Sequence, residues 1–68
     1  MYRYYMTERG FSPGAQPMKN LIDHGDYDGR VEVEPGIKAY SWVEYSEPLT
    51  DQEVAVYELV PVDPLPFN

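Results

Sequence analysis

Arginine and aromatic side chains occur together near the start of the chain, in a pattern that could hold an anionic ligand. Arg3 and Tyr5 belong to a run rich in tyrosine, and Arg9 follows in a stretch rich in glycine and proline. A guanidinium binds phosphate oxygens, and aromatic faces stack on bases and cations. Trp42 and Tyr45, in a later segment, could extend this platform. These residues predict a nucleotide site; the alternative is that the aromatics form the core and the arginines pair with the surplus of acids.

A second candidate surface is acidic, because the formal net charge is −7 and no lysine or arginine follows Lys38. Such a field repels nucleic-acid phosphates and anionic membranes and attracts basic protein surfaces. We therefore expect no duplex nucleic acid or membrane as a partner, but a basic protein surface such as that of a nucleic-acid-binding effector. The alternative is that the charge only keeps a small protein soluble. The acids expected to lie on one side of a hairpin are Glu32, Glu34, Glu44, Glu47 and Asp51.

The sequence offers little for catalysis or for metal binding. His24 is the one side chain expected to titrate near neutral pH, and no serine stands in a recognisable nucleophile motif. The absence of cysteine excludes thiolate chemistry and disulfides. The acidic segment 23–29 fails as a calcium loop, because His24 and Pro35 stand where carboxylate ligands are needed. We therefore predict a protein that is not an enzyme and that holds no cofactor or metal.

Alternation of apolar and polar residues predicts a small antiparallel sheet in the first two thirds of the chain. The expected strands are 2–8, a short edge strand at 19–24, 30–34 and 37–46. Glycine, proline and aspartate favour tight turns, so we expect a loop at 9–18 and turns at 25–29 and 35–36.

In the last third of the sequence, the two-residue alternation typical of strands gives way to a pattern typical of a helix. Thr50 and Glu53 have the spacing of a capping box, which predicts a short helix over 51–57. A final strand at 58–62 would lie at an edge, because Pro61 has no N–H to donate to a neighbour. The expected fold is α+β, with three to five antiparallel strands and one short α-helix. We expect a single domain over 1–62 and a proline-rich tail at 63–68.

The chain of 68 residues is near the lower limit for folding on a hydrophobic core alone. Its seven tyrosines, two phenylalanines and one tryptophan are many for this length and could supply that core. Association into a homo-oligomer is the other route to stability. The N-terminal segment lacks the apolar stretch of a signal peptide, so we expect a cytoplasmic protein of the host cell.

Two groups of motifs resemble a family of small proteins from phages and mobile elements of gut Firmicutes, a family without an assigned activity. The first group is Tyr2-Arg3-Tyr4-Tyr5, Arg9, Pro13-Gly14 and Pro17. The second is Trp42-Val43-Glu44-Tyr45, Leu49-Thr50 and Tyr57-Glu58-Leu59. Together they span most of the chain, while residues 19–36 depart from the pattern. The resemblance implies a setting in which small acidic proteins inhibit host defence, as anti-CRISPR proteins do, or sequester nucleotide signals.

Two functional hypotheses follow. In the first, an anti-CRISPR-like inhibitor of bacterial defence blocks a basic surface of a nucleic-acid-binding effector with its acidic side chains. In the second, an oligomeric sponge sequesters a nucleotide immune signal through Arg3, Arg9 and the nearby aromatics. The hypotheses differ in the sign of the functional charge. A purely structural role within an assembly is a third reading.

Overall fold

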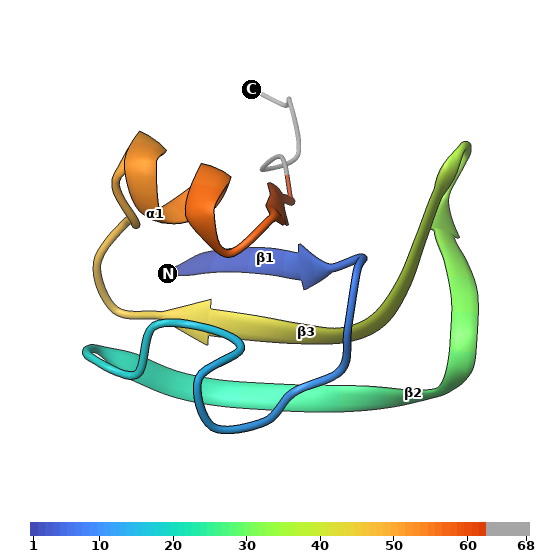
Figure 1. The fold of residues 1–68 in the computed structure, drawn as a ribbon, viewed down its shortest axis with the longest axis horizontal. Helices are drawn as coiled ribbons and strands as arrows, with labels where there is room; N and C mark the ends of the chain where they lie inside the picture. The colour runs from blue at the N-terminus through green and yellow to red at the C-terminus, as the bar shows by residue number, and fades with distance from the viewer. Residues whose placement is uncertain (63–68) are drawn as a thin grey trace.

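Two long strands form a hairpin, against which the other elements are arranged. The computed structural model describes residues 1–62, and in it the sheet order is β2-β3-β1-β4, with all neighbours antiparallel (Figure 1). The elements in chain order are β1 (Tyr2–Met6), β2 (Leu21–Glu34), β3 (Ile37–Tyr45), α1 (Asp51–Val56) and β4 (Leu59–Pro61). The predicted small antiparallel sheet with one short helix is confirmed, although the helix is a minor part. The tail predicted at 63–68 lies outside the described residues.

Strand β2 differs from the prediction, which divided the same segment into two short strands and a turn at 25–29. That division is wrong, because β2 runs without interruption from Leu21 to Glu34. The turn-forming residues instead make a large bulge, in which 27–30 lie between the paired positions Asp26–Ser41 and Val31–Ala39. Gly29 adopts a φ of 80° there, a conformation that glycine adopts without strain. Past this bulge the hairpin bends away from the line of the sheet, at the right of Figure 1; bulges bend strands in this way.

One face of the sheet carries the hydrophobic core. Alternate residues of a strand share a face, and the side chains of β1 and β3 on this face are buried, with Val43 and Tyr45 fully so. Helix α1 and the segment before β2 cover this face with apolar side chains that pack against the core. The buried core residues are Tyr4, Met6, Ala15, Val43, Tyr45 and Leu59; Phe11, Leu21, Leu49, Val54 and Tyr57 pack against them.

Helix α1 begins with the predicted capping box. The amide of Glu53 donates to the Thr50 hydroxyl at 3.0 Å, and the amide of Thr50 donates to the Glu53 carboxylate at 2.9 Å. The helix ends at Val56, one residue before the predicted end. The chain then reverses through Glu58, whose φ is 57°, and enters β4. This strand lies at a sheet edge, as predicted from Pro61.

Candidate protein-interaction surface

The outer face of the sheet, opposite the core, holds Arg3, Tyr5, Trp42 and Glu44. In the β1–β3 pairing Arg3 lies opposite Glu44 and Tyr5 lies opposite Trp42. The Arg3 guanidinium lies over the Trp42 ring, 3.9 Å from its centroid, and its Nη2 is 3.6 Å from the Glu44 carboxylate. Both the charge and the flat surface of this arginine are therefore already engaged within the molecule.

Tyr5 is also engaged. Its hydroxyl donates to the Glu34 carboxylate at 2.9 Å, which joins the centre of the sheet to the end of the bent hairpin. Burial raises the pKa of Tyr5 to about 12, and the hydrogen bond to Glu34 and the charge of that carboxylate add to the effect. The phenol thus stays protonated and acts as a donor that holds the hairpin in place.

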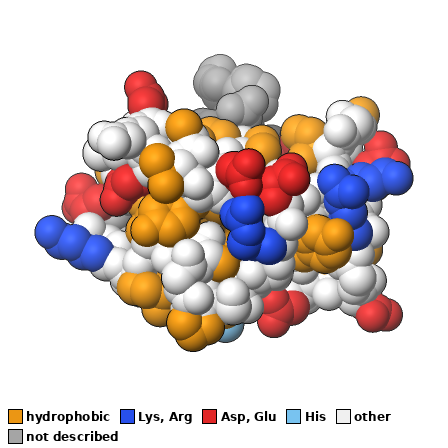
Figure 2. All heavy atoms as spheres, viewed as in Figure 1, with side chains coloured by type: hydrophobic (Ala, Val, Ile, Leu, Met, Phe, Trp, Pro, Cys, Tyr) orange, Lys and Arg blue, Asp and Glu red, His pale blue; other side chains and the backbone are white. Residues whose placement is uncertain are grey.

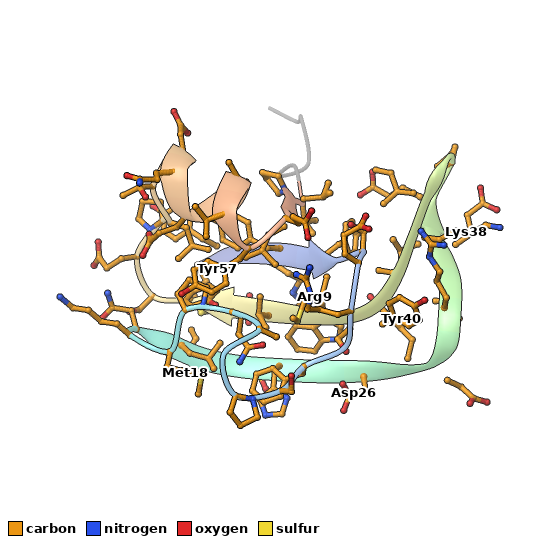
Figure 3. The ribbon with its side chains drawn as sticks, viewed as in Figure 1. Arg9, Met18, Asp26, Lys38, Tyr40 and Tyr57 are labelled. Atoms are coloured by element: carbon orange, nitrogen blue, oxygen red, sulfur yellow. The ribbon has the colours of Figure 1, made fainter. Side chains whose placement is uncertain are left out.

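Arg9 and Tyr45 lie away from the outer face. Arg9 donates to the carbonyl of Tyr57 at 3.2 Å and pairs with the Glu58 carboxylate, at the end of α1 on the core side (Figure 3). Tyr45 is fully buried, and its hydroxyl donates to the carbonyl of Pro17 at 2.7 Å. Burial raises the pKa of Tyr45 to about 12. The prediction of one nucleotide platform is corrected here: its two arginines lie on opposite faces, and Tyr45 is part of the core.

The acidic residues predicted to share one side of a hairpin are divided among three places. Glu34 and Glu44 lie on the outer face with Tyr5 and Arg3 as partners. Glu32 accepts the amide of Gly36 at the hairpin end. The last two lie outside the hairpin: Glu47 in the connection after β3 and Asp51 at the start of α1. The expectation of a single acidic hairpin face is therefore wrong in its geometry.

A different acidic surface exists, and it follows β2. This strand lies at one edge of the sheet, and it carries five acids and one arginine. Figure 3 shows Asp26 at the outer margin of the sheet, and Figure 2 shows acidic side chains at the right part of the same margin, with apolar side chains at its left part. The acids of β2 are Asp23, Asp26, Asp28, Glu32 and Glu34. We call residues Leu21–Glu34, with the backbone groups that face away from β3, the β2 edge.

Sequence reasoning missed most of this surface, because it assigned 25–29 to a turn exposed between two strands. One signal could have found it: the segment from Leu21 to Glu34 contains no proline, so nothing in it prevents a continuous strand.

Other classes of site lack support within residues 1–62. No group of three or more His, Cys, Asp or Glu side chains in that range is placed to hold a metal ion. Among the same residues, no helix is long and apolar enough to cross a membrane.

Comparison with known protein families shows which family the chain belongs to. The model of a family described as Defence against restriction A C-terminal matches residues 1–64. The chain belongs to this family, a phage family of defence against restriction, and this confirms the anti-defence setting that the sequence motifs implied. No curated protein and no solved structure matches the chain.

Proposed function

We propose that the chain is a non-enzymatic binding module that protects phage DNA by occupying a basic surface of a host restriction component. The observation that carries this proposal is the β2 edge, a single strand with five acids and one arginine at the margin of the sheet. Family membership supplies the setting, which is defence against restriction.

The charge of the expected target follows from what restriction requires. An enzyme that cuts DNA has to neutralise backbone phosphates with lysine and arginine, so its DNA-binding groove is basic. A surface of opposite charge is steered to such a groove and excludes the DNA from it. Asp23, Asp28 and Glu32 are exposed on the β2 edge, and none of them forms an ion pair within residues 1–62. Their charges are therefore available to a partner.

The nucleotide-sequestering alternative has less support from the same contacts. Arg3 is held by Trp42 and Glu44, and Arg9 is held by Glu58 on the other face. A nucleotide would compete with these partners and would meet only one of the two arginines on either face.

Charge reversal at the β2 edge tests the proposal. The exposed residues Asp23 and Asp28 are changed together to lysine, and a control changes the exposed residues Glu8 and Glu47 to lysine. Both variants gain the same positive charge, but only the first gains it on the β2 edge. The readout is the plating efficiency of an unmodified phage on hosts that express the chain and one of a panel of restriction systems.

The unaltered chain should raise plating efficiency on at least one restricting host, and the control variant should do the same. Asp23→Lys with Asp28→Lys should remove most of that protection, by about tenfold or more, since each lost charge contact weakens binding. Full protection by this variant would contradict the proposal. Failure of the unaltered chain to protect against any system in the panel would contradict it as well.

A further inference from the structure

We infer that the β2 edge binds a basic, extended segment of the partner as an additional strand of the sheet, along Asp23–Asp26. This inference rests on the proposed function and goes further, because it names the binding mode and the form of the partner. Strand addition uses main-chain hydrogen bonds for affinity and alternate side chains for specificity.

The two edges of the sheet are not equivalent. The β4 edge is three residues long and contains Pro61, which has no N–H to offer. The β2 edge is fourteen residues long, contains no proline and pairs only with β3. Within residues 1–62, no backbone hydrogen bond links Ile22–Glu34 to any element other than β3. Of the two edges, β2 is therefore the one that can accept another strand.

The backbone groups that face outward can be identified from the pairing. The carbonyl of Arg3 accepts the amide of Val62, so the backbone groups of Arg3 point toward the β4 side, away from β3. Its opposite residue Glu44 must then point its own groups at β2, where it pairs with Asp23. Because these directions alternate along a strand, His24 and Asp26 present their N–H and C=O groups to the open edge.

The free edge is partly protected by its own side chains. The amide of His24 donates to the carboxylate of Asp23 at 2.8 Å, on the open side of the strand. A lysine or arginine on an incoming strand would compete for this carboxylate and release the amide to pair with the new backbone. The contact therefore favours a basic strand over a neutral one.

The same charges argue against a second copy of this chain as the occupant. Two β2 strands that paired edge to edge would bring together two strands that each carry five acids and one arginine, and the repulsion between them disfavours this pairing. With a basic segment this repulsion becomes attraction. A register shift between Leu21 and Asp23 and the bulge at 27–30 limit regular pairing to Asp23–Asp26, which is about 13 Å of strand. Arg30 lies in the bulge and Lys38 lies beyond it, on the bent part of the hairpin (Lys38 is labelled in Figure 3), so the pairing segment contains two aspartates and no lysine or arginine.

A model peptide tests the binding mode directly. A capped hexapeptide of alternating lysine and valine is titrated into the labelled chain, and amide hydrogen exchange is followed by NMR. Saturable binding that slows exchange at the His24 and Asp26 amides by about tenfold or more is expected. A peptide with glutamate in place of lysine should not bind, nor should the lysine peptide with N-methyl groups on alternate amides along its pairing edge. Absence of binding, or protection elsewhere than on β2, would overturn the inference.

A matched pair of variants tests the same mode in cells. Asp26→Pro removes an outward N–H together with the bond that the Asp26 carboxylate accepts from the Ser41 hydroxyl, whereas Asp26→Ala removes only that bond. Anti-restriction activity should fall about tenfold or more in the proline variant relative to the alanine variant, with both confirmed as folded by circular dichroism. Equal activity of the two folded variants would overturn strand addition. If the proline variant does not fold, the exchange experiment on the unaltered chain decides.

These outcomes distinguish strand addition from the proposed function on which it rests. Loss of protection on charge reversal at Asp23 and Asp28, together with equal activity of the Asp26 pair, would leave the proposed function standing and remove strand addition. Full protection after charge reversal would remove the proposed function itself.

Discussion

Trp42 occupies the space that a side chain at Gly25 would need. The two residues are register partners in neighbouring strands, and a Cβ added at Gly25 would lie 2.6 Å from Cε2 and 2.7 Å from Cζ2 of the indole. Real Cβ contacts are essentially never below 3.0 Å. The glycine thus lets the indole lie against the strand, where the Arg3 guanidinium packs over the same ring.

We predict that Gly25→Ala lowers the free energy of unfolding by about 1–3 kcal/mol, because the indole or the strand has to shift. Urea unfolding followed by fluorescence measures this, and Trp42, the single tryptophan, serves as the probe. Gly10→Ala is the control, because a Cβ there meets only the Ser41 hydroxyl at 3.7 Å, an ordinary contact. The control variant should be neutral or slightly more stable. Equal stability of the two variants would show that the packing of Trp42 on Gly25 is adaptable.

The capping box gives a second prediction. Thr50→Ala removes the hydroxyl that accepts the Glu53 amide and should cost about 1 kcal/mol of stability. Thr50→Ser keeps that oxygen and should retain most of the stability. Thermal unfolding of the three proteins is the measurement, and equal melting of the alanine and serine variants would contradict a role for the cap.

What the sequence could predict depended on whether the signal was local. The capping box at Thr50 and the edge position of Pro61 follow from chemistry within a few residues, and both were correct. The segment 25–29 has the same local chemistry in a turn and in a bulge. Only its pairing with the long strand β3 decides between them, and that pairing is set by contacts distant in sequence.

The residues of the candidate site were also predictable only where the signal was local. One error, the placing of Trp42 and Tyr45 on one face, was avoidable. Trp42 and Tyr45 are three positions apart on one strand, so alternation alone places them on opposite faces. The structure indeed has Trp42 on the outer face and Tyr45 in the core. By contrast, no local feature of the sequence indicates that Arg9 pairs with Glu58, which is 49 residues away.

The two buried phenols give a prediction for alkaline pH. The pKa values of Tyr5 and Tyr45 are both raised to about 12 from the ordinary value of 10.0. In the unfolded chain these phenols ionise near pH 10, while in the folded chain they keep their protons. Their contribution to stability is therefore complete below about pH 10 and is lost as the pH rises toward 12.

Ultraviolet titration of phenolate absorbance on the folded protein checks this, together with urea unfolding at several alkaline pH values. Tyr5→Phe should remove one late-titrating phenol and flatten the loss of stability between pH 10 and 12. Ionisation of all tyrosines near pH 10 while the protein remains folded would contradict the prediction.

Arg9 separates the two functional hypotheses. In the structure its contacts are an exposed ion pair with Glu58 and a bond to the Tyr57 carbonyl, and exposed pairs of this kind contribute at most about 1 kcal/mol. We predict that Arg9→Ala lowers stability by no more than this and leaves anti-restriction activity unchanged. A thermal-shift panel of nucleotides should give flat results for both the unaltered chain and the variant. A nucleotide that stabilises the unaltered chain and loses that effect in Arg9→Ala would favour sequestration of a nucleotide instead, because a ligand raises stability only by binding the folded state more tightly than the unfolded state.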